Sequence, residues 1–305
     1  MKKTFLLTLT ISFFSFYSCT QEKKSINEAP KTAPLVLSPD FGDYWYQGKA
    51  EITTYALEQV RYSQSRNGNA TLIFVTEDFS RSKQVKLDNP QTNRDDIQKV
   101  MKLNFTKKFE TGVYPYSIMS SAFSPVYPKN DLHAVKITTS VQEWCGHVFM
   151  QLNKSDKQYK VLERSYFESE GDQNFELPKT WVEDELWNLL RLNPEAIPDG
   201  NVQIIPSSRF LRLKHVETKA FEATIEHSTN DSSAQLTVEY PDLKRTLSIY
   251  YESEFPHQIN SWEETYPEGG KQMTTKATLR KRILLDYWNR NNVADSTYRK
   301  DLGLE

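Results

Sequence analysis

The sequence predicts a mainly β protein: one large, curved antiparallel meander sheet, forming a half-barrel or a sandwich, with one principal helix near residues 180–192. Two observations carry this prediction. More than a dozen short segments alternate apolar with polar residues and are separated by turn residues, a pattern typical of antiparallel strands. Only one segment has clear helical periodicity, so an alternation of strands and helices is not expected.

The clearest hairpin signal lies near the start of the β region. Apolar and polar residues alternate over 50–62, and residues 70–76 follow as a second apolar segment. Between them stands Asn67-Gly68, the dipeptide preferred in two-residue hairpin turns, so we expect the chain to reverse there. The remaining strands are expected at 84–87, 100–110, 114–123, 133–143, 145–152, 158–168, 201–205, 210–216, 221–227, 234–240, 246–253, 258–266 and 273–285.

The principal helix has a start signal, an apolar face and a stop signal. Thr180 and Glu183 have the spacing of a capping box, in which each side chain accepts a hydrogen bond from a free backbone N–H. The apolar residues of 182–190 fall on one helical face, and Asn193-Pro194 ends the helix. Shorter helices are expected at 39–45 and within 291–304. The chain from 38 to 305 is expected to be a single domain; if it divides, the seam falls near 180–199.

The N-terminus indicates export. Lys2 and Lys3 precede an apolar stretch of about a dozen residues, too short for a membrane span, which needs roughly 20. We therefore expect residues 1–18 to be a lipoprotein signal peptide, Cys19 to be lipidated (palmitate among its acyl chains), and polar residues 19–37 to form a flexible tether. The alternative is an ordinary secretory signal that contains a cysteine. The expected location is a bacterial membrane, the outer membrane first, reached through the lipid anchor.

Composition narrows the function classes. The 38 basic and 40 acidic residues give a net charge of -2, which argues against nucleic acid as a partner. No glycine-rich phosphate-binding motif is present, and no cofactor is expected. If Cys19 is lipidated, Cys145 is the only thiol left and no intramolecular disulfide can form.

Six sequence blocks occur along nearly the whole chain beyond the signal: 44–53, 75–80, 83–86, 112–117, 140–147 and 254–256. Together they resemble an uncharacterised lipoprotein family of Bacteroidota. Members of that family are sometimes labelled septum formation inhibitor Maf. Maf nucleotide pyrophosphatases carry an N-terminal Ser-x-Ser-Pro-Arg-Arg motif and an α/β fold, and this sequence has neither. The resemblance therefore implies an envelope lipoprotein without implying an activity.

One cluster contains three reactive side chains in five residues: Glu143, Cys145 and His147. On a strand they would share one face, and a thiol beside an imidazole oriented by a carboxylate could act as a nucleophile. The alternative is a structural strand with a buried small thiol, which we favour because side chains at i and i+2 stand about 7 Å apart. The histidines lack metal-ligand spacing, so no metal site is expected.

Three functions follow. The first is a non-enzymatic envelope lipoprotein whose aromatic-rich β surface binds an apolar or amphipathic ligand, a lipid or glycan, or an envelope protein. The second is a thiol-dependent hydrolase or transferase that uses Cys145 and His147. The third is a structural component of an outer-membrane complex.

Overall fold

The computed structural model describes residues 33–91 and 94–304. The expected signal peptide, Cys19 and most of the tether lie outside these residues. None of the described helices is both long and apolar enough to cross a membrane.

In the described part of the chain, sixteen strands form one sheet, which confirms the mainly β prediction. All neighbouring strands pair antiparallel except β10 and β11, which are parallel. The first half comprises β1 (Ala50–Arg61), β2 (Gln64–Ser80), β3 (Val85–Lys86), β4 (Ile97–Thr111), β5 (Tyr114–Pro125), β6 (Lys136–Glu143), β7 (Gly146–Lys154), β8 (Gln158–Ser165) and β9 (Gln173–Pro178). The second half comprises β10 (Trp181–Val182), β11 (Gly200–Ile205), β12 (Phe221–Thr229), β13 (Ser233–Tyr240), β14 (Arg245–Glu252), β15 (Ile259–Glu268) and β16 (Lys271–Leu285).

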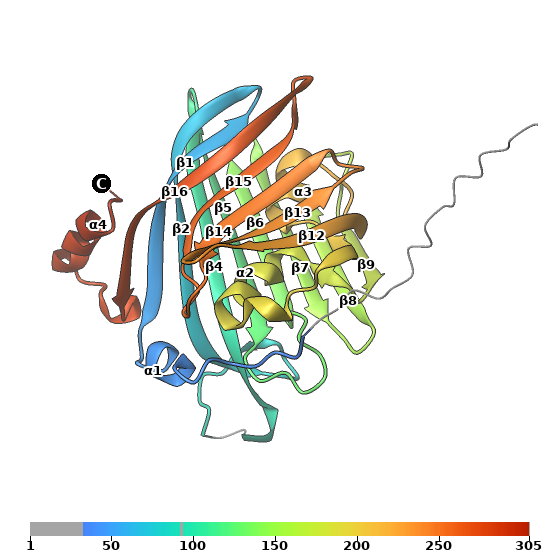
Figure 1. Cartoon of the computed structure of the whole chain (residues 1–305). Coiled ribbons are helices and arrows are strands. Elements are labelled where there is room, and N and C mark those ends of the chain that lie inside the picture. Colours follow the sequence, from blue (N-terminus) through green and yellow to red (C-terminus); the bar gives the residue numbers. More distant parts are fainter. Residues whose placement is uncertain (1–32, 92–93, 305) are drawn as a thin grey trace, which may run out of the picture.

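The sheet curls without closing. β16 pairs with β1, so the two halves of the chain join in the middle of the sheet, and β9 and β10 lie at its two edges. These edge strands are consecutive in the chain, with only Lys179 and Thr180 between them, yet no ladder joins them. Figure 1 shows the two walls of the curved sheet on either side of α2 (Glu183–Leu192).

The concave side of the sheet is filled by α2 and by α3 (Ser208–Lys214). All ten residues of α2 are buried. The Trp187 ring packs edge-on against Phe105 of β4 and Trp262 of β15, with centroids 5.0 and 5.3 Å apart. Because these two strands belong to different halves of the sheet, one helix residue joins both walls, and a single hydrophobic cluster extends from Phe41 to Ala277.

The predicted Asn67-Gly68 turn is wrong. The reversal lies at Tyr62 and Ser63, whose φ values of 55° and 59° are those of a tight hairpin turn. Gly68 lies inside β2, where an added Cβ would be 2.3 Å from the Lys108 carbonyl oxygen of β4. This glycine allows two strands to approach closely, a role that a dipeptide turn signal does not reveal.

The principal helix is present, but its predicted start is displaced. Thr180 does not cap the helix; its Oγ1 donates to the Gln203 carbonyl at 2.5 Å. The helix begins at Glu183, and Glu185 Oε1 accepts a hydrogen bond from the Val182 backbone N–H at 3.0 Å. The acidic run therefore contains the capping carboxylate two residues later than predicted. The helix ends at Leu192, before Asn193-Pro194, as predicted.

Two elements differ in kind from the prediction. Residues 210–216 are predicted to form a strand, but most of them belong to helix α3, which ends at Lys214 and is followed by His215 in the left-handed conformation (φ 55°). Arg209 and Arg212 are buried in this helix, so the usual contrast between a polar and an apolar face is missing. Edge strand β9 was not expected at all. The short helices α1 (Phe41–Trp45) and α4 (Thr297–Asp301) lie within the predicted segments.

Candidate functional site

The reactive cluster predicted on a strand lies at a hairpin turn instead. Glu143 ends β6, Gly146 begins β7, and Cys145 occupies the turn between them, where it is exposed. Glu143 Oε2 accepts a hydrogen bond from the Cys145 backbone N–H at 2.8 Å. Among the hydrogen bonds of the described residues, none joins Cys145 to His147, which is exposed. The Glu143 carboxylate raises the pKa of the Cys145 thiol, so the reactive thiolate is disfavoured.

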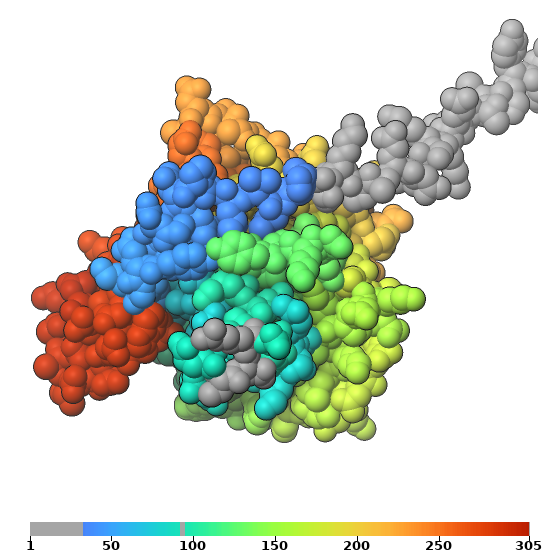
Figure 2. Space-filling view, turned by 90° about the horizontal axis from the view of Figure 1, so that it is seen from below, coloured from blue at the N-terminus to red at the C-terminus, as the bar shows by residue number. Residues whose placement is uncertain are grey.

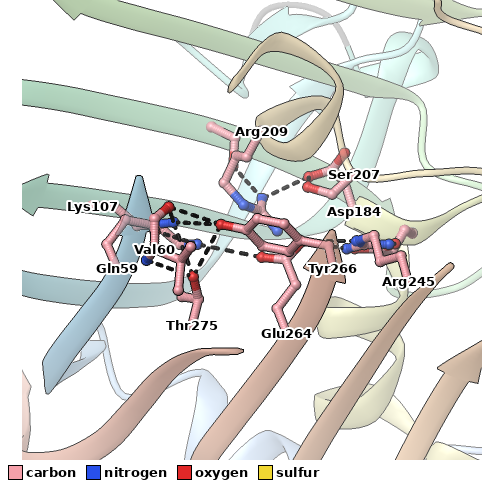
Figure 3. A network of polar contacts seen from close by, with 12 residues as sticks. Gln59, Val60, Lys107, Asp184, Ser207, Arg209, Arg245, Glu264, Tyr266 and Thr275 are labelled. Carbon is pink, nitrogen blue, oxygen red and sulfur yellow. Dashed lines mark hydrogen bonds and ion pairs between the residues drawn. The ribbon is translucent and has the colours of Figure 1, made fainter. Parts of the chain in front are cut away.

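The most strongly charged region lies inside the molecule, on the concave side of the sheet (Figure 3). Arg245 on β14 donates from both Nη atoms to Glu183 on α2, at 2.6 and 2.7 Å. Its Nε donates to Glu264 on β15 at 2.8 Å, and the Tyr240 hydroxyl donates to Glu183 at 2.7 Å. Burial alone would raise the pKa of Glu264, but Arg245 and Lys107 together keep it below its usual value.

Lys107 is the least well paired cation of this region. Its Nζ donates to Gln59 Oε1 at 3.3 Å and lies 3.8 Å from Glu264 Oε2. Burial, opposed by Glu264 and reinforced by Arg209 and Arg245, lowers its pKa to about 8. Gln59 in turn donates to Tyr266 and Thr275. Lys107 is therefore the first member of a continuous hydrogen-bond network that links β1, β4, β15 and β16.

The three acidic residues that begin α2 point to three different partners. Successive helix residues turn by about 100°, so the neighbouring carboxylates diverge. Glu183 binds Arg245, Asp184 accepts from Arg209 Nη1 at 2.6 Å, and Glu185 lies 2.9 Å from His133 Nδ1. At the other end of the helix, Arg191 donates to both oxygens of Glu51 at 2.6 and 2.7 Å. The helix is thus tied to both walls and to α3 by buried ion pairs.

This interior has little free space. The cavity between α2, α3 and the sheet measures about 20 Å³, which is about the room that one water molecule requires. Trp187 lines it, and the Trp187 Nε1 has no hydrogen-bond partner among the described residues. Around it, Lys107, Arg209 and Arg245 are matched by Glu183, Asp184 and Glu264. The interior therefore resembles a neutral structural network more than a ligand site.

A larger open groove lies at the end of the molecule where the chain enters the fold. We call it the terminal groove; its volume is about 820 Å³. The extended segment from Ala33 to Ser38 forms one wall and is fixed by Asn193, whose Nδ2 donates to the Val36 carbonyl at 2.9 Å. Figure 2 shows this blue segment crossing the lower end of the molecule, beside the orange strands of the second half. The other residues that line the terminal groove are Leu192, Pro194, Glu195, Ile197, Asp199, His227, Thr229, Ala234, Tyr251, Ser253 and His257.

The terminal groove combines an apolar floor with unpaired polar groups. Ile197, Ala234 and Tyr251 are buried beneath it. The Nε2 atom of His227 is buried and has no hydrogen-bond partner among the described residues. The His257 ring lies near Tyr251 and Phe255, and burial, the leading cause, lowers its pKa, so it is neutral near pH 7. Two imidazoles and two exposed carboxylates, from Glu195 and Asp199, therefore border an apolar surface.

No protein-family model matches this chain, and neither a curated protein nor a solved structure matches it significantly. Support for the candidate site therefore comes from its geometry alone. Sequence reasoning did not find the terminal groove because its lining residues come from five separate segments between Ala33 and His257. The nearest signal was the Asn193-Pro194 helix stop, which does place the helix end at the groove.

Proposed function

We propose that this protein is a cell-envelope lipoprotein with a non-enzymatic role, and that its terminal groove binds a single-chain zwitterionic amphiphile of the lysophospholipid class. The observation that supports this function is the groove itself: about 820 Å³ with an apolar floor and a polar border. Ligand pockets commonly measure about 300–1,000 Å³ and are mostly apolar with a few placed polar groups. The groove has both properties, whereas the interior cavity of about 20 Å³ is too small for such a ligand.

The class of head group follows from the polar border. The His227 imidazole, whose Nε2 has no other partner among the described residues, can donate a hydrogen bond to a phosphate oxygen, and the carboxylates of Glu195 and Asp199 can pair with an ammonium group. A purely anionic head would face these two carboxylates without compensation. The acyl chain would cover Leu37, Ile197 and Tyr251.

The position of the groove agrees with a lipid-anchored protein. One wall, Ala33 to Ser38, includes the last residues of the segment expected to be a tether, so a ligand bound there would lie close to the point from which the chain leads back toward Cys19. Such an arrangement brings the site near the membrane that supplies amphiphiles.

Photo-crosslinking tests the proposal. The full chain, reconstituted in nanodiscs, is incubated with palmitoyl lysophosphatidylethanolamine that carries a diazirine in its acyl chain, and labelled peptides are identified by mass spectrometry. We expect labels on 192–199, 227–234 and 251–258. Thr229→Trp, an exposed position that lines the groove, should reduce labelling at least tenfold by filling the space.

The matched control is Ser228→Trp, which places the same ring on the opposite face of β12 and should leave labelling unchanged. Labels spread over the surface, or equal labelling of the two variants, would contradict the proposal. Labelling by the corresponding free fatty acid at the same level would contradict the zwitterionic head group.

A further inference from the structure

A second surface of the described chain has no role in the proposed lipid site. It lies at the opposite end of the half-barrel, where the hairpins of the first half turn. We call it the aromatic rim; it consists of Tyr62, Tyr114, Trp144 and Tyr166. Each residue stands at a separate turn: β1–β2, β4–β5, β6–β7 and the loop after β8. Because these strands are successive neighbours in the sheet, the four rings form a row across the ends of the strands.

The rim is exposed and continuous. The exposed fractions of Tyr62, Trp144 and Tyr166 are 47%, 71% and 64%. The Tyr114 hydroxyl donates to the Tyr62 hydroxyl at 3.2 Å, and the Tyr114 and Trp144 ring centroids are 6.4 Å apart. The Tyr166 ring lies directly over Gly146, where an added Cβ would be 2.5 Å from the ring. Exposed apolar patches of this kind mark interaction sites.

A hydrogen-bond network lies directly beneath the same surface. The Tyr62 and Tyr116 hydroxyls are 2.9 Å apart, and Arg61 Nη2 donates to the Tyr116 hydroxyl at 3.2 Å. The Arg61 guanidinium carbon lies 4.4 Å from the centre of the Tyr62 ring. Arg61 Nε is buried and has no partner among the described residues. The exposed rings and the Tyr62 and Tyr114 hydroxyls are therefore held in place from beneath by the buried Tyr116 hydroxyl and the Arg61 guanidinium.

The chemistry of this surface matches a sugar more closely than an aliphatic partner. A pyranose ring presents C–H groups on its faces and hydroxyl groups around its edge, which complement aromatic faces and phenol hydroxyls, respectively. Val113 is the aliphatic side chain that is strongly exposed among the rim turns, so an apolar anchor of a protein partner would find few aliphatic contacts. The flanking exposed residues Lys108 and Glu110 carry opposite charges, and the Glu143 carboxylate beside Trp144 accepts a hydrogen bond from the Cys145 backbone N–H, which favours an uncharged ligand.

The length of the expected tether argues against contact between the rim and the anchoring bilayer; this step rests on the lipid anchor of the proposed function. About 14 residues separate Cys19 from Ala33, a reach of at most ~48 Å. β2, with 17 residues, extends ~56 Å from the rim toward the end that holds α1 and the terminal groove (Figure 1). The tether is therefore too short for a fully inverted molecule, and an upright anchored molecule has its terminal groove, not its rim, toward the lipid surface.

We propose that the aromatic rim binds an uncharged polysaccharide strand of the cell envelope, with Trp144 and Tyr114 as the stacking residues. Consecutive sugar rings would lie along the row of turns, and the hydroxyls of Tyr62 and Tyr114 would bind their hydroxyl groups. This inference goes beyond the lipid-binding role and uses none of its residues.

Calorimetric titration of the full chain in nanodiscs with a linear β-1,4-linked N-acetylglucosamine hexamer tests it. We expect saturable binding by the parent protein. The dissociation constant should rise at least tenfold in Trp144→Ala and stay close to the parent value in Trp144→Phe, which keeps an aromatic ring. Trp288→Ala removes an exposed tryptophan outside the rim and should bind as the parent does.

Absence of binding, or equal binding by Trp144→Ala, would overturn the proposal. Attachment to vesicles of phosphatidylethanolamine and phosphatidylglycerol that depends on Trp144 would also overturn it. So would binding of a purified envelope protein that depends on Trp144 when the hexamer itself does not bind. The groove variant Thr229→Trp should bind the hexamer normally, so failure of lipid binding and failure of sugar binding are separable.

Discussion

The interior of the half-barrel and its terminal groove both contain charged residues, but only the groove offers room for a ligand. In the interior, three cations face three carboxylates around a cavity of about 20 Å³. In the groove, about 820 Å³ lies between an apolar floor and imidazoles that include an unpaired, buried nitrogen. The comparison teaches that a dense cluster of buried charges does not by itself indicate a binding site; unpaired groups beside open space are the more specific sign.

The same comparison explains why α2 and α3 stay in the concave side of the sheet. A curved sheet of this size could leave an apolar cavity, but here the concavity is occupied by helices that are joined to both walls by ion pairs. Buried charges must be paired, so each pair fixes the position of its helix. If the interior network is structural, substitutions in it should lower stability far more than substitutions of exposed charges.

The largest effect is expected from Arg245→Met. It leaves Glu183 and Glu264 without their main cation in a buried site, so the free energy of unfolding should fall by ~3–5 kcal/mol. Urea denaturation followed by tryptophan fluorescence measures it. Lys276→Met removes one partner of an exposed, solvent-screened pair with Glu263 and should have a much smaller effect. Equal effects of the two variants would mean that the interior network is not structural.

Next in size is a pH effect at Lys107. Its pKa is about 8 in the folded protein and roughly 10.4 in an unfolded chain, so between these values the unfolded state binds more protons. The free energy of unfolding should therefore rise as pH increases from 8 toward 10, by ~3 kcal/mol in total. Denaturation at a series of pH values measures the slope. Lys107→Met should remove it, and a slope that persists in this variant would assign the effect to other groups.

A smaller effect is expected from Gly68→Ala. The new methyl group would meet the Lys108 carbonyl oxygen across the β2–β4 ladder, and the resulting strand shift should cost ~1–3 kcal/mol. Gly42→Ala in α1, where the nearest atom is 3.7 Å from the new Cβ, should be neutral or slightly stabilising. Thermal unfolding of both variants checks this. Unchanged stability in Gly68→Ala would show that the strands do not approach as closely as described.

The smallest effect is expected at Cys145. Because Glu143 raises the thiol pKa, the rate of alkylation by iodoacetamide should have a midpoint above the usual cysteine value of about 8.5. Glu143→Gln should lower that midpoint. Cys145→Ser should leave stability and lipid labelling unchanged. A midpoint below pH 7.5, or loss of lipid labelling in the serine variant, would revive the thiol-dependent alternative.

The sequence predicts strands well because each strand's own alternation reports which face is buried. It fails where a residue's role depends on a distant partner. Glu183 has the spacing of a capping residue, but Arg245, 62 positions away, determines its contacts. Arg209 and Arg212 hide the helical pattern of α3 because their partners Asp184 and Glu163 make burial of charge acceptable. Gly68 resembles a turn residue until β4 is placed beside it.

The candidate site was less predictable than the fold for the same reason. The aromatic content pointed to a ligand surface, but not to a particular one. The terminal groove exists only after the N-terminal segment, the helix end and strands β12 to β14 come together. Each contributes ordinary residues that carry no local motif.

Hydrogen–deuterium exchange of the full chain, with and without palmitoyl lysophosphatidylethanolamine, tests the central comparison most directly. We predict slower exchange on binding in residues 192–199, 227–234 and 251–258, and unchanged exchange in the rest of α2 and in α3. Faster exchange throughout α2 and α3 on lipid addition would contradict this account, because it would show that the helices leave the concavity and that the interior is the ligand site.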